Sequence, residues 1–285
     1  MKYMTFNNSC SYAGVANMLE DFNINIEDYE LAIRMRVPFI FKYDEKWGRY
    51  ISGSMLQEHK YFNYYLQKLG LRFIENEFSR EDALVFLHNL NNKAMLGLNI
   101  NGMHALIYSG IENGKYTFLN NRREASNEPK YYKYDFSELR EKMTQNVVIG
   151  YIEKGIGNLR FDIKEEMENS ILYLEKYRSE VENFCTKGQD VSSLKWAMNS
   201  LFRALFLDVY SMMDIIGETE LVISIAKVRL DYLNAMNLNK ALNLSEYISL
   251  SELNKTIDRY REIIELEISN SSYNDGYNLN NHINL

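Results

Sequence analysis

The character of the sequence changes near residue 155, and this change limits the folds that the chain can adopt. After about Phe161, apolar residues recur at steps of three and four, and no proline follows Pro129. This spacing is typical of amphipathic helices and lacks the alternation of strands. The second half is therefore predicted to form four helices, at 161–185, 191–216, 218–243 and 251–268.

The first half mixes helical and strand-like segments. Its helices are predicted at 11–21, 53–69, 79–90 and 136–143. Three short apolar runs, separated by Asn-Gly turn signals, predict an antiparallel meander, and a further strand closes this half. These strands are predicted at 93–100, 104–111, 115–120 and 146–153. The pattern predicts an α+β domain with an antiparallel sheet at 1–154, an all-α helical domain at 155–268 and a polar C-terminal tail at 269–285.

Composition excludes several functions. The formal net charge is −7, and this acidic balance argues against nucleic-acid binding. The two cysteines, Cys10 and Cys185, lie too far apart in the sequence to suggest a disulfide framework, and no Cys/His cluster predicts a metal site. The first residues do not resemble a signal peptide, and no apolar run is long enough to cross a membrane. We expect a cytoplasmic protein.

Cys10 is the cysteine in a chemically suggestive position, because it opens the first predicted helix. A thiol there lies near unpaired backbone N–H groups and the positive end of the helix dipole, and both favour the nucleophilic thiolate. The backbone N–H of Cys10 and a side-chain amide from Asn7 or Asn8 are candidates for an oxyanion hole. Cys185, near a helix end, is interpreted as a packing residue.

A cysteine nucleophile needs a base, and His104 is the best candidate. It follows an Asn-Gly turn and opens a predicted strand, whereas His59 and His88 lie in predicted helices and His282 lies in the tail. Asn120 ends the paired strand and is expected near the imidazole, where it would orient the ring. Asn121 is the alternative for this third position. Cys, His and Asn occur here in the order that papain-like enzymes use.

This pattern resembles the C39-like group of the papain fold. The resemblance covers roughly residues 1–153 and rests on that spacing and on the local sequences SCSYAGVANML and MHALIYSGI. The group includes bacteriocin leader peptidases and the papain-like acyltransferases of the butirosin type. The resemblance implies a papain-like catalytic domain at 1–154, with Cys10 as nucleophile, His104 as general base and acid, and Asn120 as the orienting group.

The sequence departs from the leader peptidases at three places. Ser11 stands where they have glycine after the nucleophile, no glutamine precedes Cys10, and Asn120 and Asn121 replace their Asp-Pro pair. The free-standing acyltransferases and amide synthases, such as those of closthioamide-type assembly, resemble this chain better in architecture. They imply acyl transfer from a carrier-protein thioester through acyl-Cys10 to an amine in natural-product, peptide-like antibiotic biosynthesis, with no cofactor.

Two alternatives remain open at the level of sequence. One is a C39-like cysteine peptidase that cuts a leader peptide, and the other is a catalytically silent papain-fold binding or immunity protein. The expected partners of an acyltransferase are an acyl or peptidyl carrier protein and a small amine, with no nucleic acid or membrane; a homodimer is a further option. Four arginines are candidates for contact with a phosphopantetheine phosphate, although such charges more often face solvent: Arg34, Arg36, Arg122 and Arg123.

Overall fold

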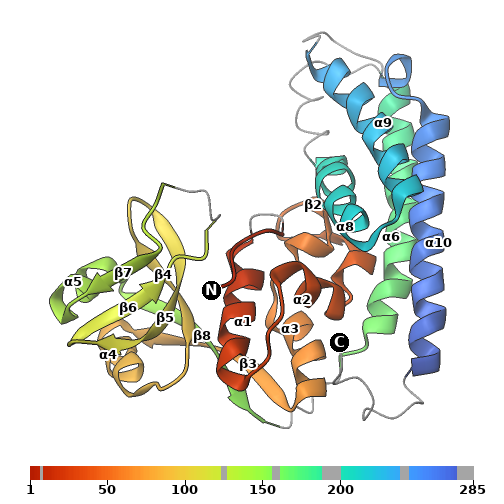
Figure 1. Cartoon of the computed structure of the whole chain (residues 1–285). Coiled ribbons are helices and arrows are strands. Elements are labelled where there is room, and N and C mark those ends of the chain that lie inside the picture. The colour runs from red at the N-terminus through yellow and green to blue at the C-terminus, as the bar shows by residue number, and fades with distance from the viewer. Residues whose placement is uncertain (7–8, 123–126, 156–160, 188–199, 238–243, 275–285) are drawn as a thin grey trace. The chain divides into compact units, whose positions relative to one another are not determined.

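The computed structural model divides into two compact units (Figure 1). It describes all residues except 7–8, 123–126, 156–160, 188–199, 238–243 and 275–285. We call Met1–Met35 with Gln57–Phe161 the sheet unit, and Arg36–Leu56 with Asp162–Leu285 the helical unit. The fold is α+β, with antiparallel sheets and several helices. In the described part of the chain, no helix is both long and apolar enough to cross a membrane.

The sheet unit is built on six antiparallel strands in the order β3-β8-β4-β5-β6-β7. Strands β4 to β7 form a meander, and β8 returns to lie between β3 and β4. The strands predicted at 93–100, 104–111, 115–120 and 146–153 are confirmed. The bounds are β3 Leu71–Ser79, β4 Ala94–Asn99, β5 Met103–Glu112, β6 Lys115–Leu119, β7 Tyr131–Tyr134 and β8 Asn146–Lys154.

Helices cover both faces of this sheet (Figure 1). On one face, α1 (Cys10–Leu19) packs on β4, β5 and β8. A Cβ on Gly14 of α1 would lie 2.6 Å from the Met95 sulfur, so this glycine lets the helix approach the sheet closely. On the other face, α4 (Arg80–Asn89) and α5 (Phe136–Lys142) bury a core with Leu96 and Leu98 of β4.

Two short helices complete the sheet unit, α2 (Asp28–Arg34) and α3 (His59–Leu66). The helix predicted at 53–69 is therefore wrong at its start, because 53–55 form a 3-10 turn. The turn packs tightly on its own unit: a Cβ on Gly53 would lie 1.6 Å from the carbonyl oxygen of Val37. The helix does end as predicted, with Gly70 at φ +67°.

The helical unit contains a β-hairpin that the sequence did not predict. Strands β1 (Phe41–Asp44) and β2 (Arg49–Ser52) pair with each other, and β1 packs on α6 (Ile163–Thr186). The Phe41 N–H donates to Ser170 Oγ at 2.9 Å, and Tyr260 Oη donates to the Pro38 carbonyl at 2.8 Å. These contacts attach 36–56 to the helices, so the compact unit differs from the continuous domain predicted at 1–154.

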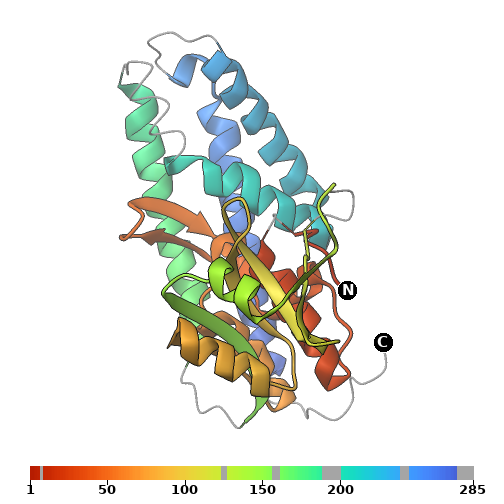
Figure 2. The same ribbon diagram turned by 90° about the vertical axis from the view of Figure 1, so that its left-hand side faces the viewer.

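Where they are described, the remaining helices follow the predicted pattern with two changes; 191–199 and 238–243 of the predicted helices lie outside the described residues. Figures 1 and 2 show α6 running alongside α10 (Leu250–Asn274), which also packs on α9 (Thr219–Asn237). Within the helix predicted at 191–216, residues Ala204–Val209 form a π-helix before α8 (Tyr210–Ile216). Helix α10 extends six residues into the predicted tail at 269–285, where serine hydroxyls such as Ser269 donate to carbonyls one turn earlier.

Candidate functional site around Cys10

Cys10 is the first residue of α1 and is partly exposed. Burial raises the pKa of its thiol, and this effect outweighs four others that lower it, among them hydrogen bonds from Ser11 and the charge of Arg122. The position at the helix N-terminus is as predicted. The helix N-terminus was expected to favour the thiolate, but the thiol is mostly protonated at neutral pH, because partial desolvation disfavours the charged form. A base near Cys10 is therefore needed for reaction at neutral pH.

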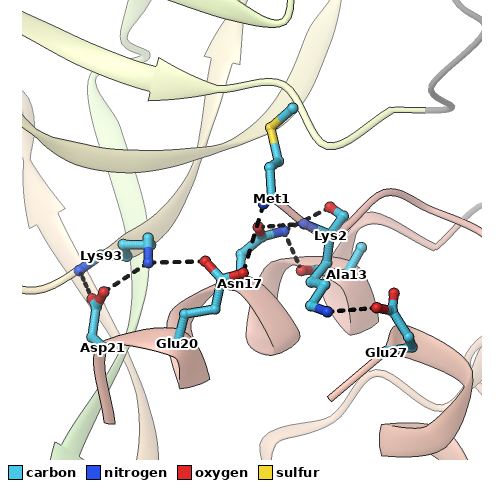
Figure 3. A network of polar contacts seen from close by, with 8 residues as sticks. All are labelled: Met1, Lys2, Ala13, Asn17, Glu20, Asp21, Glu27 and Lys93. Carbon is cyan, nitrogen blue, oxygen red and sulfur yellow. Dashed lines mark hydrogen bonds and ion pairs between the residues drawn. The ribbon is translucent and has the colours of Figure 1, made fainter. Parts of the chain in front are cut away.

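The segment before Cys10 is held against α1 by Asn17, which is fully buried (Figure 3). The Lys2 N–H donates to Asn17 Oδ1 at 2.8 Å. Asn17 Nδ2 in turn donates to the Lys2 carbonyl at 2.8 Å and to the Ala13 carbonyl at 2.7 Å. The amide thus pairs with both backbone groups of Lys2, as a neighbouring strand would, and fixes the start of the segment that leads to the thiol.

Charged side chains surround this anchor. Lys2 pairs with Glu27, and Lys93 pairs with both Glu20 and Asp21 at 3.2 and 2.7 Å (Figure 3). The Lys93 pairs connect the end of α1 with the residue that precedes β4. They add a polar connection beside the apolar contact of Gly14, and the orientation of α1 on the sheet is supported at both places.

His104 lies near the start of β5, opposite Leu98 of β4. Residues directly opposite in an antiparallel pair share a face, and Leu98 belongs to the core under α4. Alternation therefore assigns His104 to the α4 face, whereas Met95 lies on the α1 face. Within the described residues no hydrogen bond joins His104 to Cys10; the Arg122 guanidinium instead donates to His104 Nε2 at 3.3 Å.

Arg122 connects the two predicted catalytic groups. Its Nη2 contacts His104, its charge acts on Cys10, and its Nη1 pairs with Glu128. Because an arginine only donates, Nε2 of His104 accepts and the ring proton lies on Nδ1. Sequence reasoning considered Arg122 only as a solvent-facing charge or a phosphate contact. Its sequence position beside Asn120 and Asn121 was the available signal, but nothing in that position indicates a contact with His104.

The two asparagines have different roles in this geometry. Asn120 Nδ2 donates to Glu128 and to the Pro129 carbonyl, both at 3.1 Å, and its Oδ1 accepts from the Arg122 N–H at 3.3 Å. Asn121 Nδ2 donates to the Cys10 carbonyl at 3.1 Å. Asn121 is thus the one that touches the residue of the nucleophile. Neither amide has a hydrogen bond to His104 among the residues described, so the third catalytic position stays a prediction.

The other candidate residues either lie away from Cys10 and His104 or fall outside the residues that the structure describes. Asn7 and Asn8, predicted for the oxyanion hole, lie outside the described residues, as does His282. His59 is 60% exposed beside Glu75. Cys185 is buried in α6, and burial raises its pKa to about 12, which suits a packing residue. No group of three His, Cys, Asp or Glu side chains suited to a metal is found in the described part of the chain.

Comparison with known proteins adds little to this geometry. No family model and no curated protein matches the chain. Among solved structures, it is similar to the peptidase domain of Streptococcus ComA, a bi-functional ABC transporter involved in a quorum-sensing pathway. The TM-score is 0.34 at 10% identity, over 52% of this chain and 95% of that one. A likeness at this level does not assign a function, so the site is interpreted from its own residues.

Proposed function

We propose that this protein is a papain-like cysteine enzyme that transfers acyl groups through a thioester on Cys10. The observation that carries the proposal is Arg122, whose charge acts on Cys10 at the start of α1 and whose guanidinium contacts His104 on β5. A thiol, an imidazole with an acceptor nitrogen and a cation that interacts with both are components that nucleophilic acyl transfer can use.

The proposed reaction has two displacements. The Cys10 sulfur attacks the carbonyl carbon of an acyl thioester while His104 Nε2 takes the thiol proton. The donor thiol leaves with that proton, and acyl-Cys10 remains. An amine then attacks the same carbon and loses its proton to His104, Cys10 leaves as the thiol, and an amide is released. Arg122 must first withdraw from Nε2, because that nitrogen cannot accept from both groups at once.

The donor that fits this scheme best is a thioester on an acyl or peptidyl carrier protein, with a small amine as acceptor. That reaction would belong to the biosynthesis of peptide-like natural products. Thiol-for-thiol exchange requires the thiolate, and because burial raises the pKa of Cys10, the proposed reaction depends on His104 taking the thiol proton as the sulfur attacks. A peptidase of the C39-like type would use the same first step and would differ in its donor, a leader peptide, and in its acceptor, water.

A second candidate function is binding without catalysis. Two observations favour it: burial raises the pKa of the Cys10 thiol, and within the described residues His104 Nε2 hydrogen-bonds to Arg122 and not to Cys10. In this reading the papain-like unit would serve as an immunity or ligand-binding protein, and Cys10 would be an inert residue of the helix start.

Intact-mass measurement distinguishes these functions. The protein is incubated with aryl and aliphatic acyl-pantetheine thioesters, beside Cys10→Ala and the matched control Cys185→Ala. We expect a single acyl adduct on the wild type and on Cys185→Ala, none on Cys10→Ala, and faster discharge by amines than by water. Equal discharge by water would favour hydrolysis. No adduct, with Cys10 also inert to alkylation at neutral pH, would contradict the proposal and support binding.

A further inference from the structure

Asp28 is a buried carboxylate at the start of α2 that holds the segment leading to Cys10. It is fully buried, and no Lys, Arg or His among the described residues forms an ion pair with it. Its Oδ2 accepts from the N–H groups of Thr5 at 2.7 Å and Phe6 at 2.8 Å. Its Oδ1 accepts from the Thr5 hydroxyl and from the Tyr29 N–H. Four donors thus compensate a charge that is otherwise costly to bury.

The two backbone groups that Asp28 holds lie just before the nucleophile. The Ser9 N–H donates to the Phe6 carbonyl at 3.1 Å, and Cys10 follows directly. The Phe6 ring is buried and meets Tyr12 of α1 edge to face, with centroids 5.2 Å apart. The Met4 N–H donates to the Asn121 carbonyl at 2.8 Å. Residues 4–6 are thus fixed on three sides, next to the place where the thiol enters α1.

We propose that Asp28 is a positioning residue of the Cys10 site. By fixing Thr5 and Phe6, it fixes the Phe6 carbonyl that accepts from the Ser9 N–H, one residue before Cys10, whose own N–H is the predicted oxyanion donor. Such donors stabilise a tetrahedral intermediate only when they are held in place before reaction. This inference rests on the proposed acyl transfer and adds to it a residue that never touches the substrate.

The carboxylate is specifically required by this geometry. Oδ2 of Asp28 accepts from two backbone N–H groups, and Oδ1 accepts from the Tyr29 N–H and from a hydroxyl that can rotate to accept, so either orientation of an asparagine points its NH₂ at a backbone N–H. Asp28→Asn therefore removes at least one of the four hydrogen bonds with almost no change in shape. Thr5→Val is a milder second variant, because it removes only the hydroxyl donor. Asp82→Asn is the matched control, since Asp82 is an exposed first-turn aspartate of α4.

The test compares two reactions of the same thiol. Acylation by an acyl-pantetheine thioester forms an oxyanion, whereas alkylation by iodoacetamide displaces iodide and forms none. We expect Asp28→Asn to slow acylation about 10- to 100-fold, Thr5→Val to slow it less, and Asp82→Asn to leave it unchanged. The alkylation rate at the same pH should stay within about twofold in all three, because the thiol itself is not altered.

Three other results would overturn the inference. Acylation of Asp28→Asn at the wild-type rate would show that Asp28 does not position the site. If Asp28→Asn acylated more slowly but was alkylated as fast as the wild type unfolded in urea, the variant would be unfolded, and Asp28 would only keep the unit folded. Absence of an acyl adduct on the wild type would contradict the proposed function itself, and the inference with it. The wild-type control thus separates failure of the proposed function from failure of the role of Asp28.

Discussion

Replacing Asn17 with alanine tests the anchor of the N-terminal segment. The change removes an acceptor for the Lys2 N–H and donors for the Lys2 and Ala13 carbonyls, at 2.7–2.8 Å. A hydrogen bond contributes about 1 kcal/mol net, and a buried group left without a partner costs about 1–3 kcal/mol. Lys2 is partly exposed and can recover some bonding to water. We therefore expect a loss of roughly 2–3 kcal/mol in the free energy of opening of this segment.

Hydrogen exchange of peptides from 1–35, read by mass spectrometry, measures this free energy directly. Asn89→Ala is the matched control: Asn89 of α4 makes a similar bond to the Val85 carbonyl at 2.8 Å but holds no second segment, and it is exposed. The control should change exchange by less than about 0.5 kcal/mol. A loss for Asn17→Ala that is no larger than in the control would refute the reasoning.

Two further predictions follow from the pKa of Cys10 and the packing of Gly53. Because burial raises the pKa of Cys10 and Arg122 lowers it, alkylation should reach half its maximal rate above the usual pH for a thiol. Arg122→Gln should move that midpoint higher still; a downward shift in the pH profile would contradict the role of Arg122. Gly53→Ala places a Cβ 1.6 Å from the Val37 carbonyl oxygen and should destabilise the helical unit by about 3 kcal/mol. Urea unfolding followed by tryptophan fluorescence measures this, and an unchanged midpoint would argue against that packing.

The meander could be predicted because its signals are local. Asn101 and Gly102 turn β4 into β5, and Asn113 and Gly114 turn β5 into β6, all four with positive φ. Strand β3 was missed because distant residues create it: it pairs with β8, and both backbone groups of Phe73 bond to Asn63 at 2.7 and 2.9 Å. Local periodicity carries no information about such pairings.

In the candidate site, too, local signals predicted some features, and contacts between distant residues decided the others. Cys10 at a helix start and His104 at a strand start follow from local signals, and both positions agree with the structure. The direction in which the His104 side chain leaves the sheet depends on the β4–β5 register, and the contact of Arg122 depends on where Glu128 holds its guanidinium. Both depend on tertiary contacts. The sequence alone therefore paired His104 with Asn120 and gave Arg122 no role beside His104.

The central claim, that Cys10 reacts as a nucleophile with His104 as its base, is tested most directly by the rate of Cys10 acylation in His104→Gln. His59→Gln is the control, because His59 is 60% exposed. A lost general base lowers such rates by about 10²- to 10⁴-fold. We predict that His104→Gln acylates at least about 100-fold more slowly than the wild type, while His59→Gln matches it. Acylation of His104→Gln at the wild-type rate would contradict the claim.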